Sequence, residues 1–244
     1  MIILAIGMPR AGSGWHYNFI KEVMSTTDCV DARLIREQFG LQKILTEVNC
    51  NIGVLSLRRL MMVSVPAIMG KTFVIKAHSG PTIWVKLLIK AGLVKPLYIY
   101  RDPRDAMLSA QEYGARVLEK QGRPNAFSHL DDFNKALAFF EEYVADWKSW
   151  ISTDGVLATR YEDFLSDFEQ EAARIVHFLN VDPASPAITE IIKKNMPTGS
   201  VQAKQGTHFF KGQIGRFRER YSMAEQQTAW DHFGDTLIRM GYEK

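Results

Sequence analysis

The sequence predicts an α/β fold in which helices flank a parallel sheet. Short runs rich in β-branched and aromatic residues alternate with longer stretches of helical periodicity, and a glycine-rich turn follows the first of these runs. This alternation is typical of parallel strands joined by crossover helices. No internal repeat or linker-like tract interrupts the 244 residues, so we expect one domain over residues 1–244.

The predicted strands are short apolar runs. They comprise Ile2–Ile6, Thr72–Lys76, Leu97–Tyr100 and Val156–Thr159. The clearest helix is Asp131–Ser152, where apolar residues from Phe133 to Ile151 recur at steps of three and four and form one stripe. The other predicted helices are one after the first strand that buries Trp15, Phe19 and Val23, one from about Thr82 to Gly92, and a closing helix over Met223–Met240.

The composition is that of an ordinary globular chain, with 46% hydrophobic and 23% charged residues. The longest stretch without a charged side chain, Leu60–Gly70, has 11 residues. A membrane-spanning helix needs roughly 20 such residues, so none is expected. The two cysteines, Cys29 and Cys50, and an N-terminus unlike a secretory signal lead us to expect a cytoplasmic location.

The net charge of +3 is too small to indicate a nucleic-acid partner. The segment Lys193–Arg220 holds seven basic residues and one acidic residue, a local charge of 7 − 1 = +6, but it carries no nucleic-acid-binding motif. This segment indicates a bound anion or a solvated basic face, and we expect no nucleic acid as partner.

The first predicted strand ends in a glycine-rich turn that a helix follows at once. Glycines let backbone N–H groups approach an anion, and the helix N-terminus adds partial positive charge. The spacing Gly7-x4-Gly12 matches a Walker A loop, but Ser13 and Gly14 stand where that motif has Lys and Ser/Thr. Since those residues supply the phosphate-binding cation and the Mg²⁺ ligand, an ordinary NTPase or kinase is disfavoured.

Two further segments have the residue types of an anion site. The run Arg101–Asp105 follows a buried-looking strand, and Ser109 lies on the helix predicted after it. Arg101 would lie at the carboxyl end of its strand, where open α/β sheets bind ligands, and a guanidinium suits phosphate. In the basic segment, Lys211 is followed by Gly212, which pairs a cation with a flexible backbone.

Together these segments resemble the sulfotransferases that use 3′-phosphoadenosine-5′-phosphosulfate (PAPS). Pro9–Trp15 resembles the Pro-Lys-Ser-Gly-Thr-Thr-Trp loop of that family, and Arg101–Asp105 with Ser109 resembles its 3′-phosphate signature. The further matches, in the family's order, are Tyr161-Glu162-Asp163, Lys193-Lys194-Asn195 and Lys211-Gly212-x-x-Gly215. The resemblance covers about residues 2–240 and implies a P-loop-like nucleotide-binding fold with PAPS as cofactor and no metal.

The resemblance also implies which residues hold PAPS. The glycine loop would hold the 5′-phosphate end, with Trp15 near the adenine. Arg101, Ser109, Lys211 and the backbone of Gly212 would hold the 3′-phosphate. The full set implied to bind the cofactor is Arg10, Ala11, Gly12, Ser13, Gly14, Trp15, Arg101, Ser109, Tyr161, Lys211 and Gly212.

The catalytic residues implied by the resemblance lie after the second strand. The segment Val74–His78 resembles the Lys-x-His of the cytosolic members, so His78 would be the general base, with an ordinary pKa of about 6.5. Lys76 and Arg10 would stabilise the charge that grows on the bridging oxygen during in-line attack by a hydroxyl, or an amine, of a small-molecule acceptor. The other histidines, expected to be structural or on the surface, are His16, His129, His177, His208 and His232.

This sequence departs from the family pattern at several positions. Arg10 replaces the loop lysine and is too basic to donate its proton outright. Phe210 stands where many members have arginine, so Arg216 or Arg218 would have to supply that contact to the 3′-phosphate. Two other functions stay open: a phosphate-loop kinase of a nucleotide or small alcohol, which the Gly7-x4-Gly12 spacing would fit, and a non-catalytic nucleotide-binding protein on the same fold, which these departures would fit.

Two segments match nothing in the family pattern, and we expect them to shape the acceptor pocket. They are Asp28–Gly70 and Glu112–Leu130. Apolar residues in Leu57–Met69 and at Ile83–Trp84 would line that pocket or belong to the core. The sequence identifies neither the acceptor nor the oligomeric state.

Overall fold

The chain is described here from a computed structural model, which describes residues 1–197 and 213–244. Its centre is a parallel sheet with the strand order β2-β1-β3-β4. The strands are β1 (Ile2–Gly7), β2 (Phe73–Ala77), β3 (Val94–Tyr100) and β4 (Leu157–Arg160). Each predicted strand is therefore found within three residues of its predicted bounds, and the α/β prediction is confirmed.

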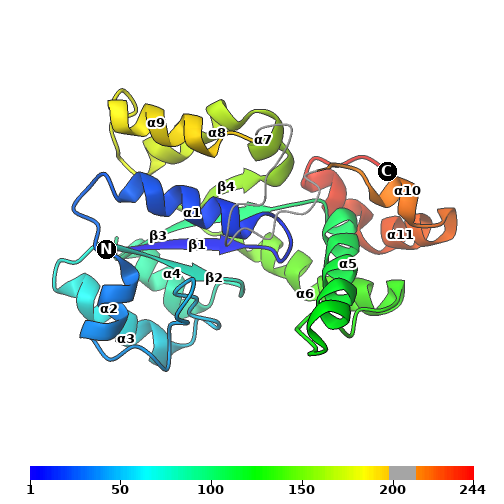
Figure 1. Cartoon of the computed structure of the whole chain (residues 1–244), viewed down its shortest axis with the longest axis horizontal. Coiled ribbons are helices and arrows are strands. Elements are labelled where there is room, and N and C mark those ends of the chain that lie inside the picture. Colours follow the sequence, from blue (N-terminus) through cyan, green and yellow to red (C-terminus); the bar gives the residue numbers. More distant parts are fainter. Residues whose placement is uncertain (198–212) are drawn as a thin grey trace.

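Helices cover both faces of this sheet (Figure 1). One face is covered by α1 (Ser13–Met24), α7 (Tyr161–Ser166), α8 (Phe168–Phe178) and α9 (Pro186–Asn195). The other is covered by α2 (Ala32–Gln38), α3 (Leu57–Ile68), α4 (Ile83–Lys90) and α6 (Phe133–Ile151). Beyond the carboxyl ends of the strands lie α5 (Pro103–Gln121), α10 (Phe217–Arg220) and α11 (Met223–Arg239).

Alternate side chains of β1 enter two separate cores, as the period of a strand requires. Ile3 and Ala5 pack with α1, α7, α8 and α9, whereas Leu4 and Ile6 pack with the helices of the other face. Because every residue of β1 is buried, this strand reads as a continuous apolar run, which is typical of a parallel sheet covered on both faces.

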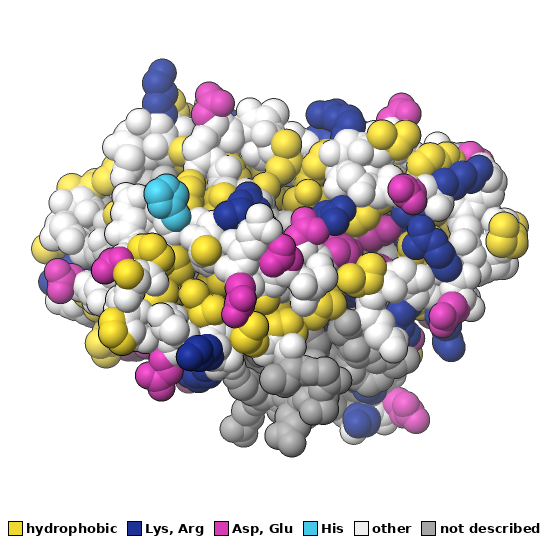
Figure 2. Space-filling model, turned by 90° about the horizontal axis from the view of Figure 1, so that it is seen from above, with side chains coloured by type: hydrophobic (Ala, Val, Ile, Leu, Met, Phe, Trp, Pro, Cys, Tyr) yellow, Lys and Arg dark blue, Asp and Glu magenta, His cyan; other side chains and the backbone are white. Residues whose placement is uncertain are grey.

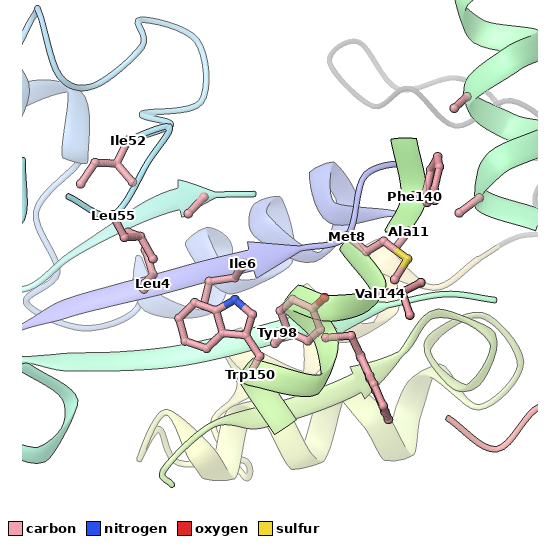
Figure 3. Close-up of a cluster of buried hydrophobic side chains, with 14 of the residues drawn as sticks. Leu4, Ile6, Met8, Ala11, Ile52, Leu55, Tyr98, Phe140, Val144 and Trp150 are labelled. Atoms are coloured by element: carbon pink, nitrogen blue, oxygen red, sulfur yellow. The ribbon is translucent and has the colours of Figure 1, made fainter. Parts of the chain in front are cut away.

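The predicted apolar stripe of α6 forms the centre of the second core (Figure 3). Trp150 is fully buried, and its indole lies 6.1 Å from the ring of Tyr98 at an interplanar angle of 24°. The Trp150 Nε1–H donates to the carbonyl oxygen of Ser79 at 3.1 Å. Ile151, expected in the stripe, is exposed instead, because Trp150 takes the place against the sheet at the end of the helix.

Helix boundaries agree with the capping signals in the sequence. The Thr82 side chain accepts from the Val85 N–H at the start of α4, and Gly92 follows that helix at a φ of 72°. Strand β3 begins three residues earlier than predicted and includes Pro96, which pairs with β1 where β4 has not yet begun. No helix among the described residues is long and apolar enough to cross a membrane.

Candidate functional site

The glycine loop connects β1 to α1 through a backbone that two glycines make possible. A Cβ at Gly7 would lie 2.5 Å from the Cβ of Ser13, and a Cβ at Gly12, which has a φ of 75°, would lie 2.8 Å from the ring of Tyr161. Arg10 adopts a φ of 64°, which is strained for a residue with a side chain. A Cβ at Gly14 would meet no other atom within 4 Å. The first turn of α1 carries no acidic residue, so its positive end is not neutralised by its own side chains.

Two of the residues beside the loop glycines, Ala11 and Trp15, belong to the core. Ala11 is fully buried, and its N–H donates to the Met8 carbonyl oxygen at 3.2 Å. Ser13 is the first residue of α1. Trp15 is almost fully buried, with its ring 4.2 Å from that of Phe164 and 5.3 Å from that of Phe168. The structure therefore packs Trp15 against α7 and α8.

Arg101 follows β3 and reaches back to the glycine loop. Its Nη1 donates to the Arg10 carbonyl oxygen at 3.4 Å and its Nη2 to the Gln213 carbonyl oxygen at 2.8 Å. Its guanidinium lies 4.6 Å from the centre of the Tyr161 ring. Its buried Nε–H has no hydrogen-bond partner among the described residues. A buried donor without a partner is costly, so this N–H is suited to a bound acceptor.

Asp105 links this corner to the segment that follows residue 212. Its carboxylate accepts from the Gly215 N–H at 2.6 Å, from the Phe217 N–H at 3.0 Å and from Arg101 Nη2 at 3.4 Å. Asp102 pairs with Arg104 through two hydrogen bonds of 3.0 and 2.8 Å. The charges of this corner, which we call the β3–α5 corner, are therefore matched inside the protein.

The ends of β1 and β2 form a second corner with different electrostatics. Arg10 Nε donates to Ser109 Oγ at 3.2 Å, and the Arg10 guanidinium lies 4.4 Å from the centre of the Tyr113 ring. His78 Nδ1 lies 2.7 Å from the Gly7 carbonyl oxygen. Lys76 is buried, and no ion pair in the described part of the chain involves Lys76, Arg10 or His78.

Burial without a counter-charge lowers the pKa of each basic group in this corner, which we call the β1–β2 corner. Desolvation lowers the pKa of Lys76 to about 8, and the neighbouring positive charge of Arg10 adds to the effect. Desolvation lowers the pKa of Arg10 to about 10. The pKa of His78 falls to about 4, first through burial and then through the charge of Lys76, against the opposing hydrogen bond to Gly7. The ordinary value of 6.5 expected for His78 is therefore too high for the free protein.

The β1–β2 corner can thus take up negative charge from a ligand. Because the Gly7 carbonyl oxygen accepts the Nδ1–H of a neutral imidazole, the lone pair of His78 lies on Nε2. An anion bound beside Lys76 and Arg10 would supply the counter-charge that no carboxylate of the described residues provides.

Several sequence predictions fall elsewhere. Lys211 and Gly212 lie outside the described residues, as does Phe210. Arg216 Nη1 pairs with Glu112 Oε2 at 3.0 Å, and Arg218 lies over the Phe217 ring, so both side chains have partners in the protein. No group of three His, Cys, Asp or Glu side chains in residues 1–197 and 213–244 is placed to hold a metal ion.

The predicted site residues Arg10, Arg101, Ser109 and Tyr161 do meet at one edge of the sheet. His16, expected to be structural or on the surface, is fully buried and packs edge-on against Phe164 with ring centres 5.8 Å apart.

Sequence reasoning missed two contributors to this edge. Asp105 is predicted only as a member of the arginine run, with no role of its own, yet it forms an ion pair with Arg101. Its position four residues after Arg101 could have predicted that pair. Tyr113 lies one helical turn after Ser109 on α5, which places both on the side of the helix that meets Arg10.

Comparisons with known proteins agree with this architecture. The sulfotransferase domain family matches residues 2–239 of the chain. Sulfotransferase 1E1 of Rattus norvegicus is 23% identical over 158 residues, covering 57% of this chain and 53% of that protein, so the chain spans about half the length of this curated relative.

Solved structures share the fold at low sequence identity. The crystal structure of mouse sulfotransferase SULT7A1 complexed with PAP gives a TM-score of 0.66 at 15% identity, covering 97% of this chain and 83% of that one. Retinol dehydratase in complex with androsterone and PAP gives a TM-score of 0.59 at 18% identity, covering 97% and 80%. With the family match extending over nearly all of the sheet and its helices, the chain belongs to the sulfotransferase family.

Proposed function

We propose that this protein transfers a sulfuryl group from PAPS to a hydroxyl, or an amine, of a small-molecule acceptor. The observation that carries the proposal is the β1–β2 corner, where Lys76 is buried and Arg10 and His78 are half-buried, all without a carboxylate partner, beside the positive end of α1. A protein holds such a cluster at a cost in stability, and an anionic ligand offsets that cost.

The residues present fit a nucleotide with two phosphate-bearing ends. The glycine loop, through Gly12, Ser13 and Gly14, would hold the 5′ end with backbone N–H groups. The unpartnered Nε–H of Arg101 supports a role in holding the 3′-phosphate, together with Ser109. Lys211 and Gly212 remain proposed contacts to the same phosphate. When bound, PAPS would supply the sulfuryl group and an anionic leaving nucleotide.

His78 is proposed as the general base. Its Nε2 lone pair would take the proton of the acceptor hydroxyl as the oxygen attacks, while Nδ1–H stays bonded to Gly7 and holds the ring in place. Lys76 and Arg10 would stabilise negative charge that develops next to them. Because Arg10 donates to Ser109 and stacks on Tyr113, it would act as a fixed donor and not as an acid.

The acceptor class is supported only through relatives. Retinol dehydratase has been crystallised with androsterone and with retinol, both small molecules. We propose a small-molecule acceptor here as well, processed by one catalytic domain over residues 1–244. The proposed location is the cytoplasm, supported by the free state of both Cys29 and Cys50.

Ligand binding tests the cofactor assignment. A thermal-shift titration would compare adenosine 3′,5′-bisphosphate with 5′-AMP and with Mg-ATP, because a ligand of the native state raises its Tm. We expect a shift specific to the bisphosphate. A larger shift with Mg-ATP would favour the kinase alternative, and tight bisphosphate binding without transfer to a broad acceptor panel would favour the non-catalytic one.

Replacement of His78 tests the base. His78→Ala should lower kcat by about 10²–10⁴-fold and leave bisphosphate affinity nearly unchanged, since general-base catalysis contributes about that much. His177→Ala, on the exposed side of α8, is the matched control and should keep full activity. The lowered pKa of His78 moves the acid limb of kcat/KM below pH 6.5, and undiminished turnover in His78→Ala would remove His78 from the mechanism.

A further inference from the structure

The outer surface of α3 and α4 exposes more apolar side chains than a solvated helix pair requires. Each helix buries one stripe in the core on this side of the sheet, represented by Val63 in α3 and Val85 in α4, both fully buried. The opposite stripes are exposed although they are apolar. The side chains at least 41% exposed on these stripes are Leu57, Met61, Val65 and Ile68 of α3 and Ile83, Trp84 and Leu87 of α4, with Met69 directly after α3.

These stripes face the same way. Both helices lie in the layer that covers one face of the sheet, and they contact each other. Because each helix buries its other stripe in the core, both exposed stripes lie on the outer side of that layer. They form one surface, which we call the α3–α4 face. The sequence predicts that these residues line the acceptor pocket or belong to the core, and the exposed ones are not part of the core.

The α3–α4 face lies in a part of the chain that has no acidic residue. Between Glu47 and Asp102 the sequence contains eight Lys and Arg and no Asp or Glu. Lys76 is buried in the β1–β2 corner, and Arg59 donates to the Ile52 carbonyl oxygen. The exposed or half-exposed cations that border the apolar stripes are Arg58, Lys71, Lys86 and Lys90.

The opposite side of the molecule has a different surface. Figure 2 looks down onto the layer of α7, α8 and α9, where basic and acidic side chains are interspersed. Glu169, Arg174, Glu190 and Lys193 are all exposed there. The α7–α9 layer therefore lacks the single sign of charge that marks the segment carrying the α3–α4 face.

We propose that the α3–α4 face docks on the surface of an anionic lipid bilayer. Apolar side chains on short amphipathic helices enter the boundary between headgroups and acyl chains, and Trp prefers that boundary. Bordering Lys and Arg add attraction to anionic headgroups. A second copy of the chain is the less fitting occupant, because a two-fold contact through this face would bring cations against cations.

Docking would place the bilayer near the proposed acceptor end of the site. Ile83 follows His78 by five residues, a chain distance of at most about 18 Å. The α3–α4 face is identified from exposure and charge, independently of the proposed function, and vesicle binding can be measured without enzymatic activity.

Vesicle flotation tests the proposal with the full chain. We expect binding to vesicles of phosphatidylcholine with 30% phosphatidylserine, and at least tenfold weaker binding to phosphatidylcholine alone. Lys90→Glu should weaken binding to the anionic vesicles about tenfold. Lys193→Glu, in the last turn of α9 on the other layer, is the matched control and should bind like the unmodified chain. Equal binding to both vesicle types, or none, would overturn the proposal.

The apolar contribution is tested by a second pair of variants. Ile68→Gln combined with Leu87→Gln should lower vesicle binding at least tenfold, because both side chains are more than half exposed and the core is left intact. Met223→Gln, 81% exposed on α11, should leave it unchanged. Circular dichroism melting confirms folding of each variant. A concentration-dependent dimer, measured by sedimentation equilibrium and abolished in the double variant, would assign the face to a second copy instead.

Discussion

The two corners at the carboxyl edge of the sheet treat buried positive charge in opposite ways. At the β3–α5 corner, Arg101 and Arg104 each face a carboxylate, Asp105 and Asp102. At the β1–β2 corner, Lys76 is buried without a carboxylate, and its pKa falls to about 8. The comparison teaches that the ion pairs of the β3–α5 corner stabilise the fold and leave one donor, the Arg101 Nε–H, for a ligand, whereas the basic groups of the β1–β2 corner have no counter-charge until an anionic ligand binds.

Breaking the matched corner should have the largest effect on stability. Asp105→Ala removes the acceptor of two backbone N–H groups and leaves Arg101 buried with one partner fewer. Loss of one member of a buried pair costs about 3–5 kcal/mol. Urea unfolding should show that loss, whereas Asp131→Ala, whose pair with Lys135 is exposed, should cost little. A loss at Asp105 no larger than at Asp131 would show that the ion pairs of this corner do not stabilise the fold.

Removing a positive charge from the β1–β2 corner should instead raise the stability of the protein. Lys76→Met should raise the free energy of unfolding at pH 7 by up to about 3 kcal/mol while lowering sulfuryl transfer, since the lysine pKa falls from 10.5 to about 8 on folding. In the unmodified protein the unfolded chain keeps this proton up to pH 10.5, whereas the folded chain loses it near pH 8. Stability should therefore rise with pH between 8 and 10.5 relative to Lys76→Met.

Urea unfolding of both proteins at pH 7, 8, 9 and 10 measures this difference. Parallel pH profiles for the two proteins would mean that Lys76 is paired in solution, and the contrast between the corners would disappear.

The close approach of Gly12 to the Tyr161 ring allows a third test, at the glycine loop between the two corners. Gly12→Ala adds a Cβ 2.8 Å from the Tyr161 ring at a positive φ, which should cost about 2 kcal/mol and weaken bisphosphate binding. Gly14→Ala lies two residues away in open space on a helix, and it should stabilise the protein by about 0.5–1 kcal/mol. Thermal unfolding compares the pair. Equal stability of the two variants would show that the loop adjusts around Tyr161.

Much of the fold could be predicted from the sequence because hydrophobic periodicity is a local property. The strands, the buried stripe of α6 and the cap at Thr82 follow from residues within a few positions of one another. The grouping of Arg10 with Arg101 was also predictable, since the carboxyl ends of parallel strands meet at one edge.

Other features of the site depend on contacts distant in sequence. Asp105 accepts from residues 110 and 112 positions later, which no local pattern reveals. The low pKa of His78 depends on burial beneath several elements and on Lys76, so the motif alone suggested an ordinary value. The outward stripe of α3 is apolar like the buried one, so its residues are predicted from sequence to line a pocket or to belong to the core, and neither prediction identifies them as exposed surface.

The central position of β1 determines the order in which the fold can assemble. β1 is the first element of the chain, yet its sheet partners begin at Phe73 and Val94, and Ile2 pairs with both. The sheet therefore has no nucleus within the first 72 residues, and closing the intervening chain costs entropy before any strand pairing compensates. During synthesis on a ribosome, β1 waits as an unpaired apolar strand until β2 and β3 have emerged, and in that interval the nascent chain is most exposed to aggregation and most dependent on chaperones.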